Sequence, residues 1–424
     1  MSISHKSVGI IVPIYNVAKY LERCLDSILA QSYTHFYVVL VNDGSSDESL
    51  EIAKRYVAKD PRFVLFDKPN GGLSSARNMG IGYFAGEYAS SDLSLVQPLS
   101  GGGQLHTIEI RSKDSISTCY VHRELVDSHP APLEPPHIDY IMFLDSDDYW
   151  VEDCLLECLK VSDGADVVWF EYQAVFDKQI TPRDFRTHLQ AFGYEKAEVI
   201  SNLDWVKRAI ERDIDFCSTS AWQVCIDFGF FMAHNLSFLD GVKSEDTLFS
   251  LYLFSLARRI VILPKVLYCY YIRAGSINDF DKMHTIASLP PYLRAMCPCY
   301  DDVKELQEYY QLASYFLMLE QFFGFLEILK ERDRELSELL YRAFVPLLVK
   351  MSLGLIDFPK DPLHLTSRFW ILKSHIPKDM RPNPIRYCAV YMPSLFAICK
   401  PILPFYVRLK RLERSLRHVC KRRK

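Results

Sequence analysis

Strands and helices alternate along the first 86 residues, and this alternation constrains the fold more than any other feature of the sequence. Three short apolar runs, typical of buried strands, occupy residues 8–12, 36–41 and 62–66. Between them, residues 18–31 and 47–59 repeat apolar side chains at the three- and four-residue steps of an amphipathic helix. Strand–helix–strand units of this kind predict a parallel sheet with right-handed crossovers.

The same arrangement indicates where a ligand would bind. In parallel α/β sheets, ligands lie beyond the carboxyl ends of the strands. Polar clusters follow the first two predicted strands at that point, at residues 13–16 and 42–47. We therefore expect a ligand at these clusters.

Residues 89–137 interrupt the alternation. They contain three consecutive glycines, a proline-rich stretch at residues 130–136 and one alternating segment at residues 107–111. About fifty residues without a core pattern predict an inserted surface excursion, which can include a hairpin.

Regular patterns resume after this insertion. Strands are predicted at residues 140–144, 167–172, 260–263 and 267–271, and helices at residues 202–212, 245–258, 303–330 and 334–350. The predicted organisation is an α/β domain of residues 1–285, a mainly helical region of residues 286–399 and a basic tail of residues 400–424.

The composition restricts the class of protein. With 49% hydrophobic and 24% charged residues, the 424-residue chain is neither collagen-like nor wholly disordered. Its net charge of −4 argues against a nucleic-acid-binding protein. The charge is uneven, because residues 400–424 carry ten Lys and Arg and one acid, Glu413, a net charge of +9. Such a tail favours an anionic partner.

The cysteines and the amino terminus bear on the compartment. The 12 cysteines form no Cys-x-x-Cys pair and no zinc-ligand spacing, which is typical of free thiols in a reducing compartment. The segment before the first predicted strand is too short for a signal peptide. The segment closest to a membrane span, residues 387–407, is interrupted by Lys400 and three prolines. We therefore expect a cytoplasmic protein that is peripheral on the inner face of the cytoplasmic membrane.

An acidic cluster at residues 145–148 follows the predicted strand at residues 140–144. Carboxylates one residue apart, such as those of Asp145 and Asp147, can face one hard divalent cation that also bridges to phosphates. A solvated acidic turn is the alternative for so short a pattern. Residues 70–80 favour the first interpretation, because they supply glycines, helix-start amides and Arg77, all suited to a diphosphate.

Together, these segments resemble family 2 glycosyltransferases of the GT-A fold. Six segments carry the resemblance in the family's order: residues 12–16, 41–47, 70–80, 143–149, 243–249 and 268–277. The resemblance spans residues 7–88 and 138–277 and does not include the insertion. It implies a Rossmann-like, mostly parallel sheet flanked by helices, with a mainly helical carboxyl-terminal region.

The resemblance also implies roles at the donor site. Pro13, Tyr15 and Asp43 would form the nucleoside pocket, with the Asp43 carboxylate accepting a hydrogen bond from a uracil N–H. Strand termination and turn capping are the alternative roles of these residues. Arg77 would contact the donor diphosphate, and a surface salt bridge is its alternative.

A metal site and a catalytic base follow from the same resemblance. Asp147 would bind Mn²⁺ or Mg²⁺, with Asp145 near the metal or the ribose, and the ion would neutralise the leaving nucleoside diphosphate. Asp246 would be the catalytic base, because an inverting transferase needs a carboxylate within hydrogen-bond reach of the acceptor hydroxyl. Glu245 would contact the acceptor, although both acids also suit a helix amino terminus.

Two further contacts are implied. Trp222 would stack on a sugar or pack in the core, and Arg273 would close over the diphosphate.

The function implied is inverting, metal-dependent transfer of a hexose from a UDP-sugar to a saccharide hydroxyl, in the synthesis of lipopolysaccharide or another surface glycan. The overall resemblance to bacterial lipopolysaccharide β-1,3-galactosyltransferases favours galactose, and the acceptor would be lipid-linked or lipopolysaccharide glycan. The alternatives are a glucosyl- or N-acetylhexosaminyltransferase of the same fold and a catalytically silent sugar-nucleotide-binding scaffold.

The tail suggests a membrane partner. Leu409, Leu412 and Leu416 recur at three- and four-residue steps among arginines and lysines. A basic amphipathic helix of this kind lies in the interface of an anionic membrane. A solvated basic tail and a helix packed on the body of the protein are the alternatives.

Overall fold

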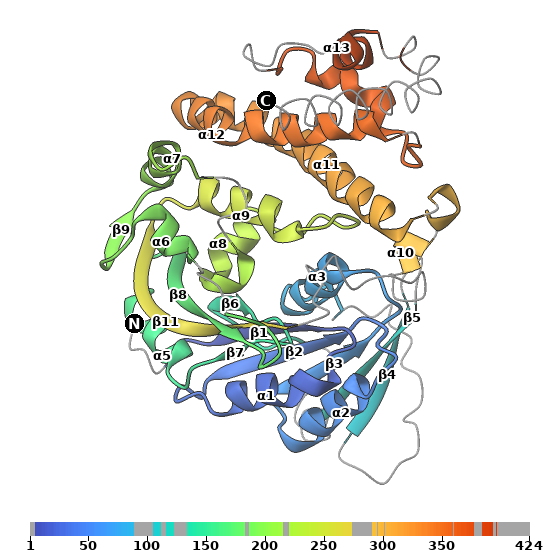
Figure 1. The fold of residues 1–424 in the computed structure, drawn as a ribbon. Coiled ribbons are helices and arrows are strands. Elements are labelled where there is room, and N and C mark those ends of the chain that lie inside the picture. Colours follow the sequence, from blue (N-terminus) through green and yellow to red (C-terminus); the bar gives the residue numbers. More distant parts are fainter. Residues whose placement is uncertain are drawn as a thin grey trace. The chain divides into compact units, whose positions relative to one another are not determined.

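The computed structural model describes the chain in a series of segments. They are residues 5–88, 105–111, 116–122, 134–182, 186–214, 220–273, 291–294, 296–300, 302–358, 360–376, 384–392 and 396. The chain divides into two compact units, Met1–Lys282 and Met283–Lys424. The first unit is built on one sheet of eleven strands, and the described part of the second is helical (Figure 1).

Four parallel strands form the centre of the sheet. Their order is β3 (Phe63–Asp67), β2 (Phe36–Asn42), β1 (Val8–Ile14) and β6 (Tyr140–Phe143). Every residue of β1 is buried. Strands covered on both faces are apolar throughout, which is why the sequence pattern located them. The predicted α/β fold is confirmed.

Further strands extend the sheet beyond β6. Strand β10 (Val224–Asp227) pairs antiparallel with β6 and with β8 (Val167–Phe176), and β11 (Ile260–Ile272) runs parallel to β8. Strands β7 (Tyr149–Trp150) and β9 (Glu198–Ile200) pair antiparallel with β11. The sheet is therefore mixed, with its parallel strands concentrated at the centre. The two strands predicted at residues 260–263 and 267–271 are one strand, whose register shifts between Leu263 and Tyr268.

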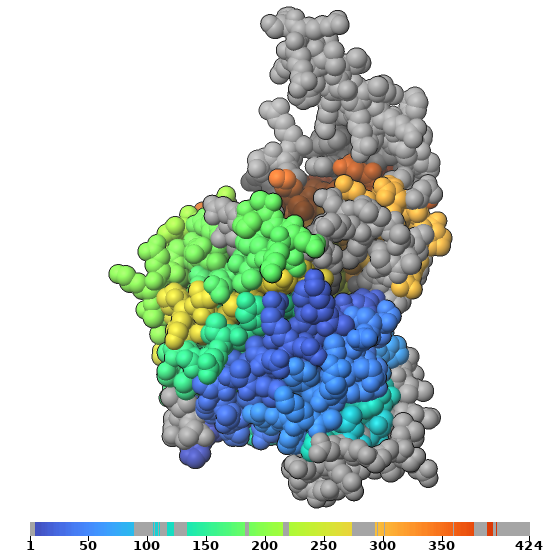
Figure 2. Space-filling model, turned by 60° about the horizontal axis from the view of Figure 1, so that its bottom comes forward, coloured from blue at the N-terminus to red at the C-terminus, as the bar shows by residue number. Residues whose placement is uncertain are grey.

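The inserted segment adds a hairpin to the opposite margin of the sheet. Strands β4 (Leu105–Arg111) and β5 (Ile116–His122) pair with each other, and β5 pairs antiparallel with β3. The side chains of Cys119 and Val121 are fully buried, and in Figure 2 the cyan residues of the hairpin lie beside the blue amino-terminal residues.

This hairpin corrects one expectation. The predicted hairpin is present, but it belongs to the sheet and its core instead of forming only a surface excursion. It gives backbone partners to the edge of β3, which would otherwise be unpaired. Most of the remaining insertion, residues 89–104, 112–115 and 123–133, lies outside the described residues.

Helices cover both faces of the sheet. In Figure 1, α1 and α2 lie on one face, and α3, α8 and α9 lie on the other. The helices of the first unit are α1 (Ala18–Leu29), α2 (Ser49–Lys59), α3 (Leu73–Phe84), α5 (Cys154–Val161), α6 (His188–Phe192), α7 (Asn202–Glu211), α8 (Phe228–Ala233), α9 (Glu245–Leu256) and the 3₁₀-helix η2 (Ala221–Gln223). The apolar stripe predicted for residues 18–31 is the buried face of α1, formed by Leu21, Cys24, Leu25 and Ile28.

The second unit contains two long helices that pack on each other, α11 (Val303–Arg332) and α12 (Arg334–Ser352). They confirm the predicted helical region. Its shorter elements are α10 (Pro291–Arg294), η4 (Cys297–Cys299), η5 (Leu353–Asp357), η6 (Leu365–Leu372) and α13 (Pro384–Tyr391). By length and composition alone, Val303–Arg332 and Arg334–Asp357 could each cross a membrane, but 50% of the apolar window in each is buried within the protein. The basic tail of residues 400–424 lies outside the described residues.

Candidate active site

Three strand ends bring the predicted donor-site residues to one edge of the sheet. Strand β1 lies between β2 and β6, and Ile14 is in register with Asn42 while Ile11 is in register with Phe143. Asp43 and Asp145 therefore follow the strands on either side of Pro13. This edge, at the carboxyl ends of parallel strands, is where α/β sheets bind ligands.

The Asp43 carboxylate organises the loop that leads into α3. Its Oδ1 accepts from the backbone N–H of Gly71 at 2.9 Å and from Lys68 Nζ at 2.6 Å. Its Oδ2 accepts from the backbone N–H of Gly72 at 2.9 Å. Asp43 is only 3% exposed, so this carboxylate serves first to hold the glycine loop against β2. Lys68 was not singled out by the sequence, and only its position just after β3 could have indicated this role.

Two glycines allow the close approaches that this site requires. Gly44 has a φ of +71°, and a Cβ there would lie 2.9 Å from the backbone nitrogen of Asn70. Gly80 lies where α3 crosses β1, and a Cβ there would lie 2.7 Å from Ile11 Cγ2. A side chain at either position would separate the elements that carry the site.

Arg77 on α3 joins two acidic segments that are far apart in the chain. Its Nη2 donates to Asp145 Oδ1 at 2.6 Å, and its Nη1 donates to Glu245 Oε1 at 2.6 Å. Its guanidinium lies 5.0 Å from the centroid of the Phe238 ring. Burial opposes the charged form, but the carboxylates of Asp145 and Glu245 raise the pKa of Arg77 above its ordinary value.

This environment corrects the alternative interpretation of Arg77. The side chain is 1% exposed, so it does not form a surface salt bridge. Both of its terminal nitrogens are held by carboxylates of the predicted donor and acceptor segments. Arg77 therefore links the end of β6 to the start of α9.

Asp147 is partly exposed and is paired with Arg273. Arg273 Nε donates to Asp147 Oδ2 at 2.8 Å, and the Asp147 side chain is 24% exposed. Burial raises the pKa of Asp147, Arg273 opposes this rise, and Asp145 adds to it. The structure thus brings Arg273, from the end of β11, to the predicted metal ligand. Beyond Arg273, residues 274–290 lie outside the described residues.

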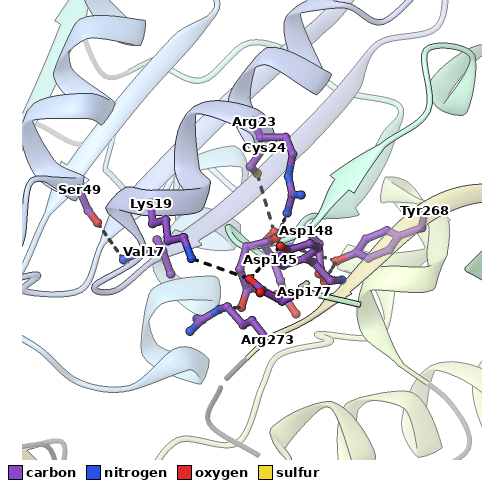
Figure 3. Close-up of polar contacts among 12 residues, drawn as sticks. Val17, Lys19, Arg23, Cys24, Ser49, Asp145, Asp148, Asp177, Tyr268 and Arg273 are labelled. Atoms are coloured by element: carbon purple, nitrogen blue, oxygen red, sulfur yellow. Dashed lines mark hydrogen bonds and ion pairs between the residues drawn. The ribbon is translucent and has the colours of Figure 1, made fainter. Parts of the chain in front are cut away.

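The acidic turn is anchored from several sides (Figure 3). Arg23 Nη2 of α1 donates to the Asp147 carbonyl at 3.0 Å. The buried Asp148 carboxylate accepts from Tyr268 Oη at 2.7 Å and from the Tyr271 N–H at 2.6 Å. Asp148 is therefore a structural anchor, and its contacts leave Asp145 and Asp147 as the carboxylates that reach the surface. Arg23 and Tyr268 were not predicted, because no local pattern connects them to this turn.

The predicted base lies at the amino terminus of α9. This helix begins at Glu245 after Ser244, which has a φ of +60°. Burial, followed by the charge of Glu245, raises the pKa of Asp246 to about 7, although Arg77 opposes the rise. A carboxylate with such a pKa holds a proton more readily than an ordinary aspartate, which suits a general base.

The remaining predicted residues have different surroundings. Tyr15 is half-buried beside the strand end, and Pro13 is buried within β1. Trp222 is 7% exposed, and its ring stacks on Tyr270 with centroids 5.4 Å apart. It also meets Tyr172 edge-on at 4.9 Å. These contacts correspond to the core-packing alternative for Trp222.

The carboxylates of Asp145 and Asp147 could bind a metal ion only together with the oxygens of a bound diphosphate. Among the residues that the structure describes, no three His, Cys, Asp or Glu side chains converge in a way that could hold a metal ion. Asp145 and Asp147 supply two partly exposed carboxylates at one turn. Mg²⁺ commonly binds through one or two carboxylates together with substrate phosphates, so this donor set fits such an ion.

The comparison with protein families agrees with the site. Residues 9–90, from β1 to the end of α3, match the sequence profile of glycosyl transferase family 2. The predicted resemblance to family 2 glycosyltransferases is therefore confirmed, and the family profile itself matches this segment of the chain.

Individual relatives match different lengths of the chain. Glycosyltransferase GlyA of Streptococcus pneumoniae is 28% identical over 276 residues, which are 64% of this chain and 31% of GlyA. The uncharacterized glycosyltransferase EpsJ of Bacillus subtilis is 49% identical over 81 residues, 19% of this chain and 24% of EpsJ. The chain thus spans less than a third of each of these relatives. Among solved structures, residues 1–349 of TarS from S. aureus in complex with UDP-GlcNAc are 16% identical, with a TM-score of 0.45 and 95% of this chain and 92% of that chain covered.

Proposed function

We propose that the chain is an inverting, metal-dependent glycosyltransferase that moves a hexose from a UDP-sugar to a saccharide hydroxyl. The observation that carries this proposal is the contact of Arg77 with both Asp145 and Glu245. These two ion pairs join a donor-side carboxylate to the helix that bears the proposed base. In an inverting transfer, the acceptor oxygen attacks the anomeric carbon from the side opposite the leaving diphosphate, so the base that takes the acceptor proton and the donor site must be held in a fixed relation.

The donor would lie along the strand ends. The glycine loop held by Asp43 presents backbone N–H groups and the start of α3, which suit phosphate oxygens. Pro13 and Tyr15 lie beside this loop and would face the nucleoside. Arg273 is paired with Asp147, which is a proposed metal ligand. When the donor and metal bind, Arg273 would leave Asp147 and close over the diphosphate.

Asp145 and Asp147 would hold a Mn²⁺ or Mg²⁺ ion together with the diphosphate. When bound, the ion supplies positive charge that stabilises the leaving nucleoside diphosphate. The two carboxylates repel each other, as the contribution of Asp145 to the raised pKa of Asp147 indicates. A cation between them would relieve this repulsion.

Asp246 would take the proton of the acceptor hydroxyl as the new glycosidic bond forms. Its pKa of about 7 places it near neutrality, where a base can be both ionised and effective. Glu245, which Arg77 holds at the start of α9, would position the neighbouring Asp246 and would also border the acceptor.

Galactose is the proposed sugar, and a lipid-linked or lipopolysaccharide glycan is the proposed acceptor in surface-glycan synthesis. Both rest on overall resemblance in sequence. A glucosyl- or N-acetylhexosaminyltransferase of the same fold is the second candidate. The proposed location is the inner face of the cytoplasmic membrane, where the basic tail would contact anionic lipid.

The test is an activity screen. The purified chain is incubated with UDP-galactose, UDP-glucose and UDP-N-acetylhexosamines, with Mn²⁺, with Mg²⁺ or with EDTA, and UDP release is measured. We expect metal-dependent UDP release from one donor, increased by a saccharide acceptor. UDP binding without turnover of any donor would instead support a sugar-nucleotide-binding scaffold.

A further inference from the structure

One tryptophan differs from the other four in the chain. Trp150, Trp169, Trp205 and Trp222 are at most 7% exposed, whereas Trp370 is 65% exposed. Trp370 is also the most exposed large hydrophobic side chain among the described residues. Tryptophan is enriched at protein interfaces and in membrane-interface belts, where its ring is in apolar surroundings and its N–H meets water.

Trp370 lies on a ridge of exposed residues on the 3₁₀-helix η6. Side chains three residues apart are aligned along such a helix, and Ser367, Trp370 and Lys373 are all exposed. The buried residues of the same helix are Leu365, Phe369 and Leu372. The packing of the apolar face therefore fixes the direction of Trp370 toward solvent.

The end of α13 lies against the same helix end. Tyr391 Oη donates to the Lys373 carbonyl at 3.3 Å, and Lys373 Nζ lies 5.6 Å from the centroid of the Tyr391 ring. The next residue, Met392, is 48% exposed. Trp370 and Lys373 thus lie at the end of η6, and Lys373 is in contact with Tyr391, which the exposed Met392 follows in the chain. Tryptophan and tyrosine rings beside basic side chains are typical of the membrane interface.

The net charge of the segment that contains Trp370, residues 358–424, is opposite in sign to that of the preceding chain. Residues 358–424 contain sixteen Lys and Arg and three Asp and Glu, which gives a net charge of +13. Because the whole chain has a net charge of −4, residues 1–357 have a net charge of −17. The segment that carries Trp370 is therefore attracted to an anionic surface, while the rest of the chain is repelled from it.

We propose that the surface formed by Ser367, Trp370, Lys373 and Met392 docks on an anionic lipid bilayer, with the Trp370 ring inserted at the headgroup level. This inference deepens the proposed attachment through the basic tail and rests on it. The tail would supply the electrostatic attraction, which falls off within a Debye length. Trp370 would supply an apolar contact on a folded element and so fix the orientation of the second unit on the membrane.

The buried state of the other tryptophans makes Trp370 a natural probe. The full chain is mixed with phosphatidylcholine vesicles, with or without phosphatidylglycerol, and tryptophan fluorescence is recorded with brominated lipids as quenchers. We expect a blue shift and quenching only with the anionic vesicles, and we expect Trp370→Phe to abolish both. The absence of quenching in vesicle-bound protein would overturn the proposal. It would indicate that the basic residues bind the vesicle by charge alone, as they would bind any polyanion.

Co-sedimentation tests the energetic contribution. Trp370→Ala should weaken binding to anionic vesicles about tenfold, the size of effect expected from one partly buried aromatic ring, and Trp370→Phe should retain most of the binding. Ile328→Ala is the matched control, since Ile328 is 60% exposed but lies among Glu327, Lys330 and Glu331. Its binding should remain unchanged.

A tail variant separates this inference from the proposed attachment. Replacing Arg411, Arg414 and Arg417 by Gln in the full chain should reduce binding if the tail attracts the membrane. Reduced binding in this variant, together with unchanged binding in Trp370→Ala, would leave the tail attachment standing and refute the docking surface. Unchanged binding in both variants would refute both.

Discussion

Two carboxylates of the candidate site, those of Asp43 and Asp145, follow neighbouring strands but are held in different ways. Asp43 is bound by Lys68, Gly71 and Gly72, all within thirty residues of it in the chain. Asp145 is bound by Arg77, which is 68 residues away and also binds Glu245, 168 residues from Arg77.

The two carboxylates therefore have different tasks in the site. The local cluster around Asp43 forms within one strand–helix–strand unit and shapes a phosphate-binding loop. The long-range cluster around Arg77 exists only when α3, β6 and α9 have packed. We therefore expect changes in the long-range cluster to affect both stability and turnover, and changes in the local cluster to affect mainly donor binding.

The largest effect is expected for Asp246→Asn, which tests whether the long-range cluster serves catalysis. The amide cannot accept the proton of an acceptor hydroxyl, so turnover should fall by about 10²–10⁴-fold while UDP affinity remains close to that of the parent chain. Steady-state kinetics and calorimetry with UDP measure the two quantities. Near-normal turnover in the variant would show that Asp246 is not the base.

Removal of Arg77 should be the most destabilising change. Arg77→Met leaves the buried Glu245 carboxylate and the partly exposed Asp145 carboxylate without their buried cation, and breaking a buried pair in this way costs about 3–5 kcal/mol. Urea denaturation measures the free energy of unfolding. Arg62→Met is the matched control, because Arg62 pairs locally with Asp60 and should cost about 1 kcal/mol or less. Equal losses in the two variants would contradict the distinction between the clusters.

The pH dependence of transfer tests the environment of Asp246. Because burial and Glu245 raise its pKa to about 7, the carboxylate gains a proton and loses its activity as a base when the pH falls below 7. We expect kcat/KM to decrease about tenfold per pH unit on this acid limb. An acid limb near the ordinary aspartate value of about 4 would indicate an exposed base.

Asp147→Ala should weaken UDP binding by about tenfold when Mn²⁺ or Mg²⁺ is present, because one oxygen ligand of the ion is lost. In EDTA, the variant and the parent chain should bind UDP alike. Isothermal titration calorimetry under the two conditions makes the comparison. A loss of affinity that persists in EDTA would mean that Asp147 contacts the nucleotide without a metal.

Asp43→Asn, which probes the local cluster, should cost less stability than Arg77→Met. The amide retains the shape of the side chain but weakens the bonds from Lys68, Gly71 and Gly72, so the free energy of unfolding should fall by about 1–3 kcal/mol. The main effect of the change should be a lower affinity for UDP. A loss as large as that of Arg77→Met would show that the local cluster also supports the global fold.

The inserted segment shows the limit of reading a sequence by pattern. Only residues 107–111 alternate visibly, and the sequence predicted a surface excursion. In the structure, residues 105–111 and 116–122 extend the sheet through β3. Strand pairing depends on an open edge elsewhere in the fold, and a local pattern carries no information about such an edge.

Local sequence patterns were enough to predict the central strands, the helices between them and the places of Asp43, Asp145, Asp147 and Asp246 at the ends of these elements. These features depend on periodicity and on motifs that lie within short stretches of chain. Three features follow only from the folded chain: the burial of Arg77 between two carboxylates, the anchoring of Asp148 by Tyr268 and the exposure of Trp370. Each depends on which surfaces meet after the chain has folded, and packing between distant segments leaves no periodic signal in the sequence.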